Sequence, residues 1–403
     1  MVFEIQLLYI DPGTGSLLLS IIMGAAMTII YSFRGLMLKS LSFFNGHSYR
    51  SHGNYPGKIV LYSEGKKYWE VFKPVLSALN SSNQAVIYLT SDLNDPGLKS
   101  GFLNVESIYI GSMNQAFYVL NRLHAKILVT TTPQLNILGW KRSKNVLHYS
   151  YIMHSPVDIH AYKLFAFDYY DSILCSGPHQ ILNLRELEEK RETKPKLLFE
   201  TGCLYYDNVL KKANKSSEHV LIAPTWGDRS FLASYCSKII KSLLEAEITT
   251  VLRPHPQSWI SDKKILKQIR TDFENHKHFH FDNEEDPVKS LMSAKIVICD
   301  KTSGIIYDNI LVNKKPVIAI DFEWDQGGYE SHQLSSDISS LELLKFCGKV
   351  IRKSEINSIA SEVKSLINLK QRNVEVSNFV FNFSCAGKVA AKQLIDLNKS
   401  LII

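Results

Sequence analysis

Short apolar runs alternate with stretches of helical periodicity from residue 58 onward, and this alternation constrains the fold more than any other feature of the sequence. Each apolar run has the length of a β-strand, and the segments between consecutive runs are long enough for a crossover helix. Strands that are joined through crossover helices lie parallel to one another in a sheet that helices cover. The pattern therefore predicts an α/β fold built on parallel sheets.

The alternation runs through the chain twice. The first series predicts strands at 58–62, 85–89, 108–110, 127–131, 146–152 and 173–175, with helices at 68–79 and 116–123. The second predicts strands at 220–223, 249–252, 278–281, 295–299 and 316–320, with helices at 235–244 and 286–293. We also expect an exposed helix and loop at 184–196, and a helical tail at 361–401 that is interrupted near 373–383. Two doubly wound, Rossmann-like domains in tandem enclose a cleft, and ligands bind at the carboxyl ends of such strands.

The N-terminal segment has the composition of a transmembrane helix. No charged side chain occurs between Pro12 and Phe33, and residues 17–33 are almost wholly apolar. A helix needs ~20 such residues to cross a bilayer, so this stretch is long enough for a spanning helix. The turn at 11–16 lacks the Gly-Lys-Ser/Thr ending of a phosphate-binding loop. A cleaved signal peptide is the alternative. A signal peptide would begin with basic residues, but here Glu4 precedes the apolar run and no Lys or Arg does. Basic residues follow the run where a small-residue cleavage site would be expected.

These following basic residues predict a single pass through the inner (cytoplasmic) membrane, with the globular part on the cytoplasmic side. The expected organisation is a membrane anchor at 1–40 and an N-terminal Rossmann-like domain at 41–205. A C-terminal Rossmann-like domain at 206–385 and a C-terminal helix at 386–403 complete it.

The composition is that of a globular chain. Of 403 residues, 45% are apolar and 21% charged, which excludes collagenous, coiled-coil and disordered classes. The net charge of +7 suits a polyanionic partner, either phosphate esters or an anionic membrane surface. The sequence contains no run of basic residues with interleaved aromatic residues, so we do not expect a nucleic-acid partner. Six cysteines are scattered without a C-x-x-C pair, so we expect buried, reduced thiols in a cytosolic compartment.

Polar side chains follow several predicted strands, at the edge where a ligand is expected. His154 follows the strand 146–152 within the segment Met153-His154-Ser155-Pro156. An imidazole at the point where a strand becomes a loop can reach the cleft and act as a general base. A structural histidine that is bonded to backbone is the alternative, and the sequence alone does not decide between the two.

In the second series, Thr225 and Trp226 follow the first strand, and Arg253 and His255 follow the second. Arg253 and His255 share one side of the extended chain because side chains alternate with a period of two. A guanidinium fork beside an imidazole suits a diphosphate. Structural pairing of Arg253 with an acidic residue is the alternative.

The strand 295–299 leads through Thr302, Ser303 and Gly304 into a predicted helix. Small residues at such a junction expose backbone N–H groups and the positive end of the helix dipole, which favours phosphate. Asp308, about one turn into the helix, would accept hydrogen bonds from ribose hydroxyls. The alternative is an ordinary helix cap with an acid at the surface.

These motifs, taken in their order, resemble those of a known family, the CDP-glycerol glycerophosphotransferases of teichoic-acid-type polymer synthesis. The resemblance covers roughly residues 58–395, with Gly227 in place of the family's arginine and Arg229 shortly after it. It is carried by the segments His154-Ser155-Pro156, Ala223-Pro224-Thr225-Trp226, Arg253-Pro254-His255-Pro256 and Thr302-Ser303 up to Asp308.

The resemblance implies a GT-B fold and transfer of glycerol phosphate or another polyol phosphate from a CDP-activated donor. The acceptor would be a hydroxyl of a membrane-linked glycan or polymer, and CMP would be released. Residues 41–205 would bind the acceptor and residues 206–385 the donor, with His154 and His255 as catalytic residues. The donor-binding residues implied are Thr225, Trp226, Arg253, Thr302, Ser303, Gly304 and Asp308.

Three other functions are open at this point. A GT-B glycosyltransferase would use a nucleotide sugar for cell-surface polysaccharide synthesis. A nucleotide-sugar epimerase would turn over a soluble donor without an acceptor, and an inactive transferase would serve as a membrane-bound assembly partner. The alternating His276, His278 and His280 lack a convincing fourth ligand, so we expect no protein-bound metal and no cofactor.

Overall fold

The computed structural model describes residues 53–401 except 113, 138, 211–218, 283–286 and 370–371, together with Met23. The chain divides into two compact units, Met1–Gly53 and Asn54–Ile403, and the second holds all the elements considered below. Apart from Met23, the predicted membrane helix at 17–33 lies outside the described residues. In the part of the chain that is described, no helix has the length and apolar character needed to span a bilayer.

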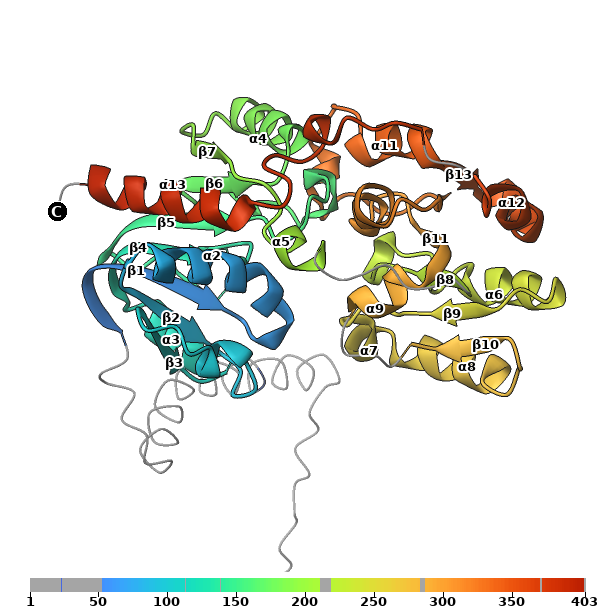
Figure 1. Cartoon of the computed structure of the whole chain (residues 1–403), viewed down its shortest axis with the longest axis horizontal. Coiled ribbons are helices and arrows are strands. Elements are labelled where there is room, and N and C mark those ends of the chain that lie inside the picture. The colour runs from blue at the N-terminus through green and yellow to red at the C-terminus, as the bar shows by residue number, and fades with distance from the viewer. Residues whose placement is uncertain are drawn as a thin grey trace, which may run out of the picture. The chain divides into compact units, whose positions relative to one another are not determined.

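The first sheet has seven parallel strands in the order β3-β2-β1-β4-β5-β6-β7 (Figure 1). Helices α2 (Trp69–Ser81), α3 (Asn114–Leu120) and α4 (Pro178–Lys190) belong to this half of the unit. The strands are β1 (Asn54–Ser63), β2 (Val86–Thr90), β3 (Val105–Tyr109), β4 (His124–Thr130), β5 (Val146–Ile152), β6 (Ser172–Cys175) and β7 (Leu197–Glu200).

The second sheet has six parallel strands in the order β10-β9-β8-β11-β12-β13. They are β8 (His219–Ala223), β9 (Thr250–Leu252), β10 (Phe279–Phe281), β11 (Ala294–Asp300), β12 (Val317–Asp321) and β13 (Gly348–Arg352). The short α5 (Tyr206–Val209) precedes this half. Its helices are α6 (Cys236–Glu245), α7 (Ser258–Ser261), α8 (Lys263–Phe273), α9 (Pro287–Met292), α10 (Ile305–Tyr307), α11 (Ser339–Cys347) and α12 (Ile359–Leu366).

Both sheets are buried on their two faces, as the continuous apolar strands predict. In β1, Ile59 and Leu61 join one core cluster while Val60 and Tyr62 join another, because successive side chains point to opposite faces. β8 divides in the same way, with Leu221 and Ile222 in different clusters. The predicted pair of Rossmann-like halves is therefore confirmed.

Every predicted strand is present to within a few residues, and the differences lie at the sheet edges and in charged helices. The segment 184–196 is not simply an exposed helix and loop, because α4 buries Leu184 and Leu187 and leads into β7. Edge strands β7 and β13 were missed because they are short and only partly buried. Five cysteines are buried and Cys385 is exposed, and all six are free thiols.

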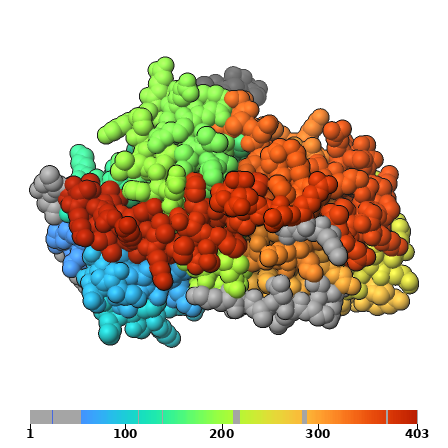
Figure 2. Space-filling view, turned by 45° about the horizontal axis from the view of Figure 1, so that its top comes forward, coloured from blue at the N-terminus to red at the C-terminus, as the bar shows by residue number. Residues whose placement is uncertain are grey.

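The last helix, α13 (Ala386–Ser400), belongs to the core of the first half although it follows the second half in sequence. It packs along α2, and Figure 2 shows the end of the chain as a continuous red band on one face of the molecule. Asp207 receives hydrogen bonds from the backbone N–H groups of Ala386 (3.0 Å) and Gly387 (2.8 Å). A Cβ at Gly387 would lie 2.6 Å from the Cβ of Pro74, so only glycine permits this approach.

We expect Leu394→Ala to lower the free energy of unfolding by about 2–5 kcal/mol, because Leu394 is fully buried in the core that α13 shares with α2. The measurement is urea denaturation followed by circular dichroism. Lys392→Ala on the exposed side of the same helix is the matched control and should change stability little. Equal stability of the two variants would contradict the packing of α13 described here.

Candidate functional site

His154 stands immediately beyond β5, with aromatic rings on two sides. Its imidazole lies edge-on to Tyr68 (5.8 Å between ring centroids) and to Tyr162 (6.0 Å). Its Nδ1 is buried and has no hydrogen-bond partner among the described residues. Burial, with help from the positive charge of Lys67, lowers the pKa of His154 to about 4, although Glu64 opposes this. The imidazole is therefore neutral at pH 7 and able to accept a proton.

His255 follows β9 on the other half of the unit, and its side chain is exposed beside the indole of Trp226 (6.2 Å between centroids). Desolvation of its ring by the surrounding protein lowers the pKa of His255 to about 4, and the positive charges of Arg229 and Lys67, with that of His154 when it is protonated, act in the same direction. Charges act on one another appreciably within about 10 Å at moderate ionic strength. The structure thus brings the two predicted catalytic histidines, one from each half, into one electrostatic environment.

Arg229 is one of the cations that act on His255. Its Nη1 donates a long hydrogen bond to Thr302 Oγ1 (3.5 Å), and no carboxylate of a described residue pairs with its guanidinium. Burial lowers its pKa, while Asp300, Tyr329 and Tyr162 act in the opposite direction. An arginine that is partly buried without a carboxylate partner is a strong candidate for binding an anion.

The carboxylate of Asp300 fixes the loop that carries Thr225, Trp226 and Arg229. Its Oδ2 accepts hydrogen bonds from Thr225 N–H (2.6 Å) and Thr225 Oγ1 (2.9 Å), and its Oδ1 accepts one from Phe231 N–H (2.8 Å). Burial raises the pKa of Asp300 to about 6, although these hydrogen bonds and Arg229 oppose the rise. Asp300 is not among the predicted site residues, although an acid that directly follows the apolar strand residues 296–299 could have indicated a role.

Arg253 forms an ion pair with Asp282 at 2.5 Å, and this carboxylate is almost completely buried. Asp282 also accepts a hydrogen bond from Ser290 Oγ. The structure therefore shows the structural alternative, pairing with an acid. A contact of Arg253 with a donor stays a prediction.

Gly304, which follows Thr302 and Ser303, lies where the two halves touch. Thr302 and Ser303 are buried, and the N–H of Ser303 donates to the carbonyl of Asp300 (3.0 Å). A Cβ at Gly304 would lie 2.5 Å from Ser155 Oγ, so the absence of a side chain permits the close approach of the loop that carries His154. The helix that follows is only α10, which continues into a π-helical turn (Asp308–Asn313).

Asp308 receives a hydrogen bond from the hydroxyl of Tyr206 (2.9 Å), a residue of α5. Burial raises the pKa of Asp308 to about 7, against the effect of this hydrogen bond. The structure thus gives Asp308 an internal partner, and its contact with a ribose is still a prediction.

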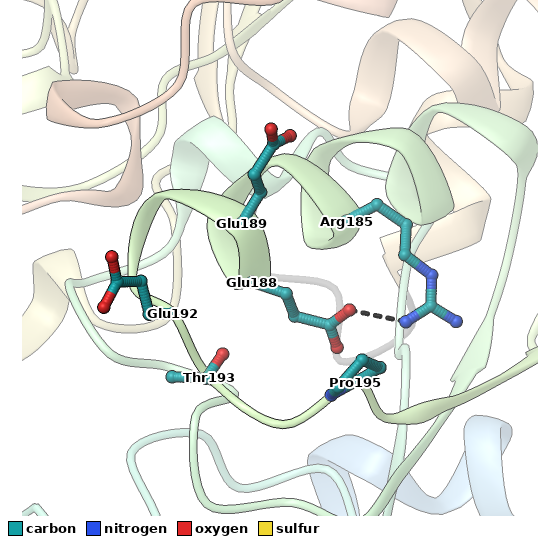
Figure 3. Close-up of a pocket in the computed structure, with 6 residues that line it drawn as sticks. All are labelled: Arg185, Glu188, Glu189, Glu192, Thr193 and Pro195. Carbon is teal, nitrogen blue, oxygen red and sulfur yellow. Dashed lines mark hydrogen bonds and ion pairs between the residues drawn. The ribbon is translucent and has the colours of Figure 1, made fainter.

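A shallow hollow between the end of α4 and the segment before β7 is not part of this site (Figure 3). Its wall includes an ion pair between Arg185 and Glu188 at 2.5 Å. Glu189 and Glu192 add further negative charge. None of its lining residues is among those that surround His154 and His255, and its acidic wall does not suit a phosphate ester.

The comparisons with known proteins rest on structure alone. No protein-family model matches the sequence, and no curated protein matches it significantly. The UDP-GlcNAc 2-epimerase of Neisseria meningitidis, solved with UDP-GlcNAc, superposes with a TM-score of 0.54 at 12% identity, covering 84% of this chain and 99% of that one. The Methanocaldococcus jannaschii enzyme gives 0.53 and 12%, with the same coverage. A putative Listeria monocytogenes enzyme gives 0.51 and 11%, covering 86% and 96%.

The fold is GT-B-like. At this level of identity the likeness concerns the fold alone, two Rossmann-like domains with parallel sheets, and it agrees with the fold that the motifs implied. It does not extend to the CDP-glycerol donor, which stays an inference from the motifs.

We expect the Asp308→Asn variant to gain stability over the wild type as the pH rises from about 4 to about 7. An unfolded aspartate ionises near pH 3.9, whereas Asp308 in the folded protein ionises near 7. Between these values the folded state holds the extra proton, so the wild type loses up to about 4 kcal/mol of unfolding free energy that the amide does not lose. Urea denaturation at pH 4.5 and 7.5 measures the difference.

Asp396→Asn is the control for this experiment, because Asp396 is exposed on α13. It should leave the pH dependence of unfolding close to that of the wild type. A difference between wild type and Asp308→Asn that does not change with pH would show that Asp308 is ionised in the folded protein throughout this range.

Proposed function

We propose that this protein is a GT-B-type transferase. It binds a donor that is activated by a nucleoside diphosphate and transfers a group from it to an acceptor hydroxyl where the two halves meet. The observation that carries the proposal is the meeting of His154 and Ser155 from the first half with His255, Arg229 and Gly304 from the second.

The diphosphate of the donor would bind to Arg229 and His255. The guanidinium of Arg229 forms no ion pair with a described carboxylate, although Asp300 acts on it electrostatically, so it can make a bidentate contact with a phosphate. His255 is neutral at pH 7 in the free protein, and a bound dianion would raise its pKa and favour the protonated, donating form. Thr225 and Trp226 would line the donor side of the same loop, which Asp300 holds in place.

His154 would act as the general base. Its neutral imidazole takes the proton of the acceptor hydroxyl while the oxygen attacks the β-phosphorus of the donor in line. The bond from this phosphorus to the bridging oxygen breaks, and CMP leaves. A well-placed base accelerates such a step by about 10²–10⁴-fold, and the cationic groups around the diphosphate offset the charge on the departing nucleotide.

A CDP-activated polyol is the first candidate for the donor. The motifs that resemble the CDP-glycerol glycerophosphotransferases lie far apart in sequence, and His154, Thr225 and His255 each follow the carboxyl end of a strand, which supports a common site. On this proposal the acceptor is a membrane-linked glycan or polymer. The predicted anchor at 1–40 would hold the enzyme at the cytoplasmic membrane, where such an acceptor is found.

A nucleotide sugar is the second candidate, favoured by the superposition on UDP-GlcNAc 2-epimerases. The same cations would then hold the diphosphate, but the reaction would take place at the anomeric carbon and a nucleoside diphosphate would leave. An epimerase would carry out its reaction without an acceptor. The released nucleotide therefore distinguishes these functions.

The test is a donor screen with the full-length protein. CDP-glycerol, CDP-ribitol, UDP-GlcNAc and GDP-mannose are compared by thermal stabilisation and by nucleotide release in the presence of a membrane extract as acceptor. We expect stabilisation by the CDP compounds and release of CMP that depends on the extract. Release of UDP or GDP would support the nucleotide sugar as donor instead of the CDP-activated polyol. No thermal stabilisation by any of the four compounds would contradict both candidates.

We expect His154→Ala to lower kcat by about 10²–10⁴-fold while nucleotide binding by calorimetry is retained, because the imidazole acts on the acceptor. His276→Ala, which removes an exposed histidine elsewhere, is the control. Turnover like that of the wild type in His154→Ala would remove this residue from the chemistry.

We expect Arg229→Gln to weaken nucleotide binding by about tenfold to a hundredfold, which corresponds to one lost hydrogen bond to a charged group. Arg352→Gln, at an exposed arginine, is the control. An unchanged Kd in Arg229→Gln would exclude Arg229 from the diphosphate site.

A further inference from the structure

One segment of the second half, residues 328–336, lies against the first half, and we call it the strap. The N–H of Leu164 donates to the carbonyl of Gly328 (3.1 Å), and the N–H of Glu330 donates to the carbonyl of Tyr162 (2.8 Å). Between them, Lys163 and Tyr329 form an antiparallel bridge. The strap thus extends from the loop after β12 and is held by backbone bonds to the loop that contains Tyr162.

A buried ion pair strengthens this attachment. The carboxylate of Glu330 is fully buried, pairs with Arg191 at the end of α4, and accepts the N–H of Ala166 (3.0 Å). Arg191 also bonds to Asp168 (2.5 Å) and to Gln333 of the strap (2.7 Å). Removing one member of a buried, bonded pair leaves the other charge uncompensated, so the strap has one strongly preferred position.

The ring of Tyr329 is fixed by the strap and by its neighbours. It is only 3% exposed. Lys163 Nζ lies 3.7 Å from the ring centroid, and Trp324 packs against it edge-on at 4.9 Å. The direction of the hydroxyl is therefore set by the backbone bonds on either side of this residue.

The hydroxyl of Tyr329 faces the candidate site. A Cβ at Gly227 would lie 3.8 Å from it, and it interacts electrostatically with Arg229. Buried tyrosines normally give their hydroxyl a hydrogen-bond partner. Among the described residues the Tyr329 hydroxyl makes no hydrogen bond, and it is not one of the fully enclosed unpaired polar atoms, so it is open to solvent or a ligand. A neutral donor without a partner beside an arginine without a carboxylate is an arrangement that fits a phosphate oxygen.

We propose that Tyr329 donates a hydrogen bond from its hydroxyl to a phosphate of the bound nucleoside diphosphate beside Arg229, and that Arg191 positions it through the strap. This inference rests on the proposed function and deepens it. Its consequence is specific, because a residue of the first half that does not touch the nucleotide then contributes to nucleotide affinity.

The first test is calorimetry of the full-length protein with CDP and with UDP as probes. We expect Tyr329→Phe to raise the Kd of the nucleotide that the wild type binds by about tenfold, because one hydrogen bond to a charged group is lost. The free energy of unfolding in urea should be nearly unchanged. Tyr169→Phe, which alters an exposed tyrosine of the first half, should leave Kd unchanged. Wild-type affinity in Tyr329→Phe overturns the inference.

The second test is a double-mutant cycle with Arg191→Gln. If Arg191 acts through Tyr329, the single variant weakens binding, and adding it to Tyr329→Phe weakens binding no further. Additive losses would refute the positioning role. Should Arg191→Gln fail to fold, Arg191→Lys takes its place in the cycle, because lysine keeps the charge but loses the bidentate geometry.

The two proposals fail in different ways. If Tyr329→Phe binds like the wild type while Arg229→Gln binds weakly, only the inference about Tyr329 is wrong. If the wild-type protein binds neither CDP nor UDP, the proposed function itself is wrong, and the inference is overturned with it.

Discussion

The close approach of two loops, one from each half, is the constraint on which the candidate site depends. Gly304 has no side chain, and a Cβ there would lie 2.5 Å from Ser155 Oγ. The approach brings His154, at the end of β5, within the electrostatic reach of His255, at the end of β9. Without it, each half would present only part of a site. Glycine at this position therefore has a steric reason, and a contact of Gly304 with a donor phosphate stays a prediction.

Desolvation and neighbouring charges together determine which groups at this junction are charged. His154 and His255 are both neutral at pH 7, because the surrounding protein and nearby cations disfavour a further positive charge. The carboxylate of Asp300 accepts three hydrogen bonds from the loop at 225–231. Arg229 is left as the permanent cation without a carboxylate partner among the described residues. This distribution suits a site that receives negative charge from its ligand and a base that starts uncharged.

The contacts between the halves are polar as well as steric. Asp158, after β5, accepts hydrogen bonds from Ser339 N–H (2.6 Å) and from the hydroxyl of Tyr307 (3.0 Å). Glu330 of the second half and Arg191 of the first form another connection. Buried polar contacts specify geometry because each partner is costly to leave unpaired. The geometry of the site is thus set by residues that do not themselves belong to it.

The sequence alone determined the two parallel sheets and the strand ends that carry His154, Thr225 and His255, because strands and helices follow from local periodicities. It predicted β5 with its exact bounds and left edge strand β13 out. Only the tertiary structure decided the partners: Asp282 for Arg253, Tyr206 for Asp308, and α2 for α13. These pairings join residues whose separation along the chain carries no periodic signal. They depend on packing, in which burial and charge select a partner after the strands and helices have assembled.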